Sequence, residues 1–534
     1  MRKSKRRSLA WWALPVSAVV FLAPVVPAGE VSAVVRSKFF EPLKPPRPVQ
    51  VTAHGGARGT APQSTPSSIL ICADDGIEWV AVTVRLTRDG AHVLAHDPKL
   101  ENLSDGSGEV ASRTLAEIEQ LDAGSWFARR YEGVRLLTLR RALALSKGRI
   151  NLRLECAQVD PESLVDEIKR AGMIRQVIVL GDADTTARVR AASAGQIAVM
   201  ERCGSRADLE SRPRRTPLDA VEIPARLATS DFCRACRERG TWVEADATGR
   251  DQDRPETWSR LVAAGVNCVL TDFPQEFIVW SIQSRGAARP VQISFHRAAS
   301  RYAPENTMPT IERAIALGAD YIELDIRRSR DGVCMLLHDA RLNRTSNARG
   351  SISDQNADDL ARVDAGSWFG QPFKGTRIPT FEQALTALSG RCGLYLDAKS
   401  IPPEQVAELL RRHNMTRRSV VFQSPSYLTR LRSIDPEVRR MPSLNDPRDL
   451  DKLADEIKPY AFDANWAILS KDLIDRCHAR GILVFSDALG YYETVEAYMR
   501  AIDLGIDVIQ TDHPLRVWRA IELRLSRPVA QSKE

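Results

Sequence analysis

The chain has 534 residues, of which 43% are hydrophobic and 27% charged, so it can bury more than one core. With only 30 glycines and 30 prolines, this composition excludes a disordered, collagen-like or low-complexity protein. The formal net charge is +7, but five of those charges lie in the first seven residues, and +7 minus five leaves +2 for the rest. We therefore expect no binding to nucleic acid.

The first residues have the pattern of an export signal. Met1–Arg7 is basic, Leu9–Ala28 is apolar, and cleavage could follow either Val-Pro-Ala ending at Ala28 or Val-Ser-Ala ending at Ala33. This pattern predicts a signal peptide over 1–33 and an exported protein, periplasmic or extracellular, close to the membrane or cell envelope. The alternative is an uncleaved anchor, since about 20 apolar residues can span a bilayer. A proline-rich lead-in follows at 34–48.

After this lead-in the sequence consists of two tandem copies of one domain. The motif Asp-Ala-Gly-Ser-Trp-Phe occurs at 122–127 and again at 364–369, and the His-Asp and Arg-Asp-Gly motifs recur with the same offset of 242 residues. Such a long period indicates duplication of a whole domain, because solenoid repeats are far shorter. The repeat predicts two domains, 49–285 and 286–534.

Within the second domain, short apolar runs alternate with amphipathic stretches, which favours parallel strands joined by crossover helices. The expected strands are Val291–Phe295, Tyr321–Ile326, Val333–Leu337, Gly393–Ala398, Ser419–Gln423, Ile482–Ser486 and Val508–Thr511. The expected helices are Met308–Leu317, Thr380–Ala387, Pro403–Arg412, Lys471–Arg480 and Tyr492–Leu504. The domain size favours an eight-stranded barrel, so the predicted fold class is α/β, with two tandem (β/α)8 TIM-type barrels. In such barrels the chemistry lies at the carboxyl ends of the strands.

Three acidic residues of the second domain fall on expected strands. Glu323 and Asp325 are two residues apart, so their side chains face the same side of one strand, and Asp397 ends another. Neighbouring carboxylates repel each other unless a proton or a cation intervenes. One carboxylate could simply pair with a basic residue. Three of them without an adjacent cysteine favour a hard divalent ion, Ca²⁺ or Mg²⁺.

Basic and proton-transferring residues accompany these acids. His296 and His338 end strands, Arg297 adjoins the first histidine, and Lys399 lies just past Asp397. Cations, a metal ion and two proton-transfer groups are what hydrolysis of an anionic phosphodiester requires.

Several motifs of the second domain resemble those of the glycerophosphodiester phosphodiesterase family. They are His296-Arg297, Pro304-Glu-Asn-Thr307, Glu323-Leu-Asp325, Arg330-Asp-Gly332, His338-Asp339, Ile378-Pro-Thr380, Leu396-Asp-Ala-Lys399 and Thr511-Asp-His-Pro514. The resemblance implies a phospholipase-C-like barrel that uses a divalent cation to hydrolyse glycerophosphodiesters to glycerol 3-phosphate and an alcohol.

The resemblance also implies roles for individual residues. His296 and His338 would be the acid/base pair, and Glu323 and Asp325 would be metal ligands. Asp397 stands where the family usually has a glutamate ligand.

Two further roles concern charge: Arg297 would bind phosphate and Lys399 would stabilise developing charge. Two segments depart from the family, Ser424-Pro425 and Val484–Ala488, and they leave the preferred alcohol open. The oligomeric state is also left open.

The first domain has lost most of this set. His54 and His96 match the two histidines, and Glu155 matches Asp397. The other site positions are occupied by Ala81, Thr83, Gly55 and Ala157, in place of Glu323, Asp325, Arg297 and Lys399. We expect the first domain to lack this activity. It could pack rigidly beside the second domain, bind a head group or an envelope component, or retain weak metal-free chemistry.

Two alternative functions remain at this point. The same fold could act as a lysophospholipase D or as a phosphoinositide-type phosphodiesterase with a cyclic phosphate intermediate. Both domains could also bind envelope phosphodiesters without catalysis.

Cysteine usage adds one structural expectation. Nine cysteines are too few for a disulfide scaffold in a chain of this length. The Cys233–Cys236 pair lies in a helical pattern and is expected to be buried rather than to bind zinc.

Overall fold

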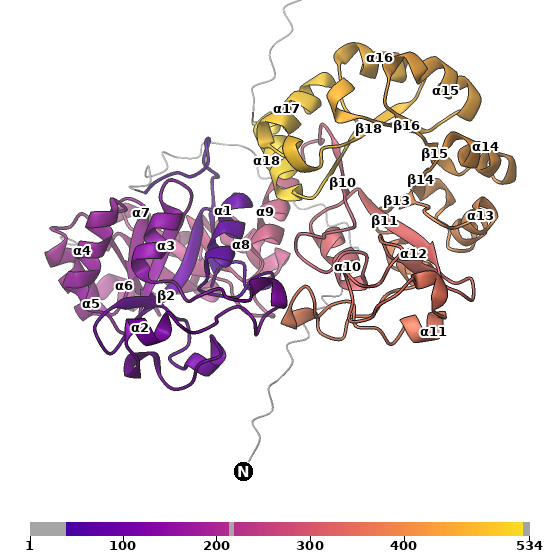
Figure 1. Cartoon of the computed structure of the whole chain (residues 1–534). Coiled ribbons are helices and arrows are strands. Elements are labelled where there is room, and N and C mark those ends of the chain that lie inside the picture. Colours follow the sequence, from indigo (N-terminus) through magenta and orange to yellow (C-terminus); the bar gives the residue numbers. More distant parts are fainter. Residues whose placement is uncertain (1–38, 213–217, 527–534) are drawn as a thin grey trace, which may run out of the picture. The chain divides into compact units, whose positions relative to one another are not determined.

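The computed structural model describes residues 39–212 and 218–526, so the predicted signal peptide lies outside the described residues. The chain divides into two units between Ser284 and Arg285. Figure 1 colours the first unit indigo to magenta and the second pink to yellow. In the described part of the chain, no helix is long and apolar enough to cross a membrane.

The first unit is a closed barrel of eight parallel strands. They are β1 (Gln50–His54), β2 (Trp79–Leu86), β4 (Asn151–Cys156), β5 (Val177–Leu180), β6 (Ala198–Arg202), β7 (Ala220–Pro224), β8 (Trp242–Asp246) and β9 (Cys268–Thr271). The order runs β1-β9-β8-β7-β6-β5-β4-β2, and pairing of β1 with β2 closes the ring. The short β3 (His92–Leu94) pairs antiparallel with β2.

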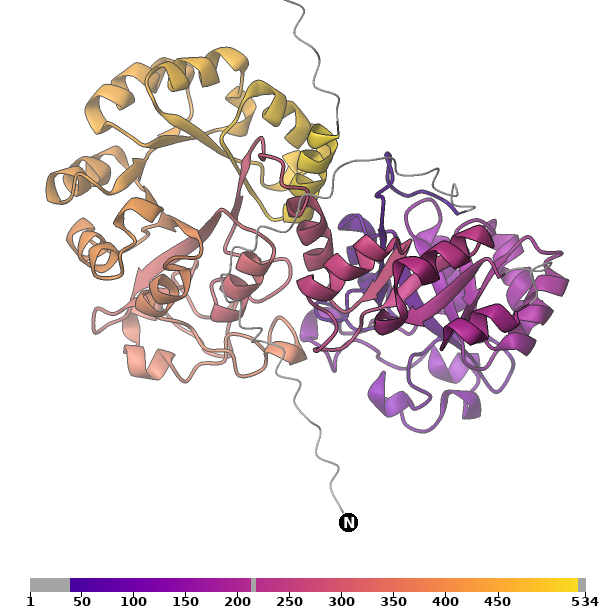
Figure 2. The same ribbon diagram turned by 180° about the vertical axis from the view of Figure 1, so that it is seen from behind.

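The helices of the first unit surround these strands, as both Figure 1 and Figure 2 show. They are α1 (Pro66–Asp74), α2 (Leu115–Ile118), α3 (Leu139–Ser146), α4 (Pro161–Ala171), α5 (Ala183–Ala192), α6 (Arg206–Ser211), α7 (Ser230–Glu238), α8 (Pro255–Ala264) and α9 (Pro274–Gln283). Cys233 and Cys236 lie buried in α7, as expected.

The second unit repeats this architecture. Its barrel strands are β10 (Gln292–Phe295), β11 (Tyr321–Arg328), β13 (Gly393–Asp397), β14 (Ser419–Phe422), β15 (Arg439–Met441), β16 (Ser443–Leu444), β17 (Ala461–Ala464), β18 (Leu483–Asp487) and β19 (Val508–Thr511). β15 and β16 are two halves of one strand, interrupted at Pro442, which has no N–H for the ladder. The Pro442 carbonyl still accepts a hydrogen bond from the Asp463 amide at 3.0 Å. β12 (Cys334–Leu336) pairs antiparallel with β11.

Nine helices of the second unit are described. They are α10 (Met308–Ala316), α11 (Ala357–Leu360), α12 (Phe381–Leu388), α13 (Pro403–Arg412), α14 (Pro425–Ile434), α15 (Leu450–Ile457), α16 (Lys471–Ala479), α17 (Val495–Leu504) and α18 (Pro514–Leu525). The predicted fold class, two tandem TIM-type barrels, is confirmed.

The two barrel interiors differ in chemistry. In the second unit, the rings of Tyr321, Tyr395 and Phe485 pack together among buried apolar residues. In the first unit Arg153 occupies the position of Tyr395, and its Nε lies 3.1 Å from Oε2 of Glu244. The same guanidinium pairs with Glu222, so one barrel has an aromatic layer where the other has a buried ion triad.

Candidate active site of the second unit

Three carboxylates converge at the carboxyl ends of neighbouring strands. Glu323 and Asp325 lie on β11, and the parallel register pairs Asp325 with Asp397 of β13. One oxygen from each residue lies within 4.8 Å of the other two, and Glu323 and Asp325 are buried. Three converging carboxylate oxygens are a donor set suited to a hard divalent cation.

The negative charge of this cluster is only partly balanced by the protein. Nζ of Lys399 lies 3.1 Å from Oδ1 of Asp325 and also pairs with Asp397. Burial and the neighbouring Asp325 charge raise the pKa of Glu323 well above its usual range. Burial also raises the pKa of Asp397, despite the nearby Lys399 ammonium. A bound cation would relieve this cost, so the residues present fit a divalent ion.

The loop after β10 orients two of these carboxylates. The Arg297 amide donates to Oε2 of Glu323 at 2.7 Å, and Nδ2 of Asn306 donates to Oδ2 of Asp325 at 2.8 Å. Arg297 itself has a φ of 48°, in the left-handed region that favours glycine. The first unit has Gly55 at this position, with a φ of 70°. The second unit therefore keeps a guanidinium here in a conformation that costs backbone strain.

His296 is held by a carboxylate at the end of the adjacent strand, β19. Its Nδ1 lies 2.9 Å from Oδ1 of Asp512, which Ser300 also contacts at 3.2 Å. Burial lowers the pKa of His296, but the hydrogen bond to Asp512 and the charge of Glu323 outweigh it and raise the pKa to about 9. With Nδ1 engaged, Nε2 is the nitrogen available for proton transfer.

His338 has a similar support on the opposite side of the cluster. Its Nδ1 lies 2.8 Å from Oδ1 of Asp339, and Nε of Arg344 lies 2.8 Å from the other oxygen of that carboxylate. Arg344 and His338 hold the pKa of Asp339 well below its usual range. Arg344 also binds Glu305 at 2.7 Å, and Glu305 lies 3.2 Å from Nη1 of Arg297.

The structure brings the predicted site residues together at one end of the barrel. The backbone amides next to the two histidines bind the strand of the acidic cluster: the Arg297 amide donates to Glu323, and the Leu337 amide donates to the Asp325 carbonyl at 3.0 Å. Sequence reasoning found neither Arg344 nor the pairing of Asp512 with His296.

Two segments of the chain, 54–276 and 296–516, match the model of the glycerophosphoryl diester phosphodiesterase family. The chain belongs to this family. The recognition from sequence, the tandem duplication and the assignment as an enzyme of this class are confirmed.

Individual relatives each match about one unit. A glycerophosphodiester phosphodiesterase of Bacillus subtilis is 29% identical over 250 residues, which cover 41% of this chain and 82% of the relative. One from Caldanaerobacter subterraneus is 28% identical over 231 residues, covering 41% of this chain and 93% of the relative. The crystal structure of a glycerophosphodiester phosphodiesterase from Agrobacterium tumefaciens is 32% identical and covers 43% of this chain and 99% of its own, with a TM-score of 0.40.

The family site is incomplete in the first unit. His54 keeps its carboxylate partner, with Nδ1 2.9 Å from Oδ1 of Asp272. Ala81 and Thr83 supply no carboxylates, and Glu155 is paired with Arg202 at 2.5 Å. Within residues 39–212 and 218–284, no three acidic, histidine or cysteine residues converge as metal ligands.

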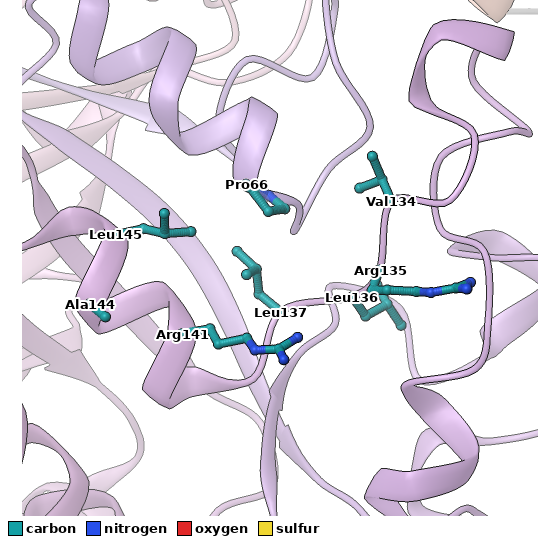
Figure 3. Close-up of a pocket in the computed structure, with 8 residues that line it drawn as sticks. All are labelled: Pro66, Val134, Arg135, Leu136, Leu137, Arg141, Ala144 and Leu145. Carbon is teal, nitrogen blue, oxygen red and sulfur yellow. The ribbon is translucent and has the colours of Figure 1, made fainter.

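The first unit also has an apolar hollow of about 540 Å³ beside the starts of α1 and α3 (Figure 3). It is lined by Pro66, Val134, Arg135, Leu136, Leu137, Arg141, Ala144 and Leu145. No counterpart of the second-unit site residues lines it.

Proposed function

We propose that the second unit is a metal-dependent phosphodiesterase that hydrolyses glycerophosphodiesters to glycerol 3-phosphate and an alcohol. The observation that carries this proposal is the convergence of Glu323, Asp325 and Asp397 beside two carboxylate-supported histidines. The first unit would not catalyse this reaction, because it lacks the converging carboxylates.

The chain's own groups suit each task of the reaction. Glu323, Asp325 and Asp397 would hold the divalent ion, Ca²⁺ or Mg²⁺, which supplies positive charge next to the phosphate. Arg297 and Lys399 add fixed cations beside the same carboxylates, where a phosphodiester would carry its charge.

The two histidines suit proton transfer. Each ring is fixed through Nδ1 by an aspartate, which leaves Nε2 to exchange a proton with the attacking water or the leaving alcohol. Such a pair at one phosphodiester would serve as acid and base.

The test is hydrolysis of glycerophosphodiesters by the full chain with Ca²⁺ or Mg²⁺. Addition of a chelator, Glu323→Ala and His338→Ala should each abolish hydrolysis, with general acid–base loss alone costing about 10²- to 10⁴-fold. The matched variant His96→Ala in the first unit should retain full activity. Unchanged hydrolysis in Glu323→Ala would refute the metal role, and loss in His96→Ala would refute an inactive first unit.

Product analysis separates this reaction from its relatives on the same fold. Phosphorus NMR should show glycerol 3-phosphate, and a cyclic phosphate would instead indicate a phosphoinositide-type reaction.

We also propose that the protein is exported, on the basis of its basic and apolar leader. Protein recovered outside the cytoplasm should begin after Ala28 or Ala33, as read by mass spectrometry. A full-length chain confined to the cytoplasm would contradict export.

A further inference from the structure

Three aromatic side chains gather at the carboxyl ends of two adjacent barrel strands, β17 and β18. Trp466 follows β17, and Tyr491 and Tyr492 follow β18. The ring centroids of Trp466 and Tyr492 are 6.1 Å apart at an interplanar angle of 29°, and Tyr491 meets Tyr492 edge-on at 5.7 Å. We call these three residues the aromatic rim.

Two side chains of the aromatic rim are exposed to solvent. Tyr491 is 92% exposed and Tyr492 is 37% exposed. Single exposed aromatics are unremarkable, but adjacent ones at a barrel mouth indicate a binding surface.

A carboxylate precedes the aromatic rim in the chain. Asp487 ends β18, four residues before Tyr491, and its charge interacts with those of His296 and Asp397. Its Oδ1 is buried and has no hydrogen-bond partner in the structure. A buried carboxylate oxygen without a partner is costly, so a cationic group placed here would be stabilised.

The repeat provides an internal comparison. Strands β8 and β18 correspond with an offset of 241 residues, which places Ala225, Arg250 and Asp251 where the second unit has the aromatic rim. Asp246, the counterpart of Asp487, is bonded by its neighbour Thr248 at 2.6 Å. The first unit, which lacks the converging carboxylates, therefore also lacks the aromatic rim and the unpartnered carboxylate oxygen. Because the rim and the oxygen occur only in the unit that has the carboxylate cluster, we associate them with substrate binding.

We propose that the aromatic rim and Asp487 bind a cationic alcohol moiety, so that the preferred substrates are glycerophosphodiesters of amino alcohols such as choline or ethanolamine. This inference rests on the proposed function. Aromatic faces attract an ammonium through their quadrupoles, and the carboxylate supplies the opposite charge. The rim lies at the same end of the barrel as the carboxylates and histidines.

The charges around the rim favour this ligand over a membrane surface. Aromatic residues that dock on anionic lipid are accompanied by lysine or arginine. Here the strand before Tyr491 and Tyr492 ends instead in the carboxylate of Asp487, which does not attract an anionic surface.

The test compares kcat/KM for glycerophosphocholine with that for its neutral carbon isostere, the 3,3-dimethylbutyl diester. We expect the full chain to prefer the charged diester by about tenfold, the scale of a partly desolvated cation–π contact. Trp466→Ala, Tyr492→Ala and Asp487→Asn should each raise KM for glycerophosphocholine more than KM for the neutral diester, and the turnover that remains on the neutral diester shows that the variants fold. Trp466→Phe should retain part of the preference, and Trp126→Ala, at an exposed tryptophan of the first unit, should retain all of it.

The outcomes separate this inference from the proposed function. Hydrolysis of neutral diesters without preference for charged ones overturns the inference alone. Failure to hydrolyse any glycerophosphodiester overturns the proposed function. If the rim variants lose kcat/KM equally for the charged and the neutral diester, the rim has a structural role. Rim variants that keep the preference but no longer bind anionic vesicles show that the rim binds membranes instead.

Discussion

Each histidine of the second unit has its own aspartate, and these supports differ in sequence distance. Asp339 adjoins His338, whereas Asp512 lies 216 residues from His296. The chain could reveal the first pair as a motif. It could not reveal the second, because only closure of the barrel brings β10 against β19.

The charge of Asp512 sets the protonation of His296, so Asp512→Asn should lower the pKa of His296 from about 9. The kcat for diesters should fall by roughly 10- to 100-fold with a smaller change in KM, because ring orientation and charge support proton transfer. NMR titration of the histidine ring measures the pKa directly. The matched Asp272→Asn in the first unit should leave hydrolysis unchanged, and an unshifted His296 pKa would refute the positioning role of Asp512.

Among the loops, the repeated Asp-Ala-Gly-Ser-Trp-Phe motif proves to be structural. The Asp364 carboxylate accepts hydrogen bonds from the amides of Gly366, Ser367 and Gly375, at 2.8–2.9 Å. A Cβ at Gly366 would collide with the Phe373 carbonyl, so only glycine fits there. Both units retain this loop, and the shared motif therefore reports a common fold rather than a shared activity.

The corresponding Asp122 gives this loop a pH dependence. Burial tends to raise its pKa, but amide donors from Ser125, Gly133 and Gly124 outweigh burial and lower the pKa to about 2. A depressed carboxylate pKa stabilises the fold above the unfolded value near 3.8, and this stability is lost as the pH falls through about 2.

Asp122→Ala should therefore lower stability at pH 7 by about 1–3 kcal/mol, the scale of charge-assisted hydrogen bonds. Calorimetry should show the difference from the unsubstituted chain shrinking between pH 4 and pH 2. A difference that is constant with pH would contradict the electrostatic origin.

At the level of strands, sequence patterns found the apolar runs and missed the interrupted ones. β11, β13 and β19 were expected within a few residues of their observed bounds. The segment of β15 and β16 was missed because Pro442 breaks its pattern, and β17 was missed because its sequence, Ala-Phe-Asp-Ala, contains only one large apolar residue.

Taken whole, the molecule is a duplication whose two cores have diverged. The periodicity of the sequence was sufficient to predict two barrels, because both copies keep the alternation of strands and helices. It could not predict the buried triad of Arg153, Glu222 and Glu244, because these residues come from three separate strands.

Removing the cation from this triad should destabilise the first unit selectively. Arg153→Ala leaves two carboxylates buried without their partner, which typically costs about 3–5 kcal/mol. We expect a lower unfolding temperature for one calorimetric transition, with the second transition and diester hydrolysis unchanged. The matched variant Tyr395→Phe in the second unit should leave the unfolding temperature of the first unit unchanged. Loss of hydrolysis in Arg153→Ala would instead reveal that the second unit depends on the first.

The same arginine makes the divergence hard to reverse. The parallel register pairs Ala81 with Arg153, so a glutamate restored at position 81 would lie beside the guanidinium and be neutralised by it. Supplying the missing carboxylates alone would therefore not build a cluster like that of the second unit. The buried guanidinium already provides the opposite charge at this level of the first barrel.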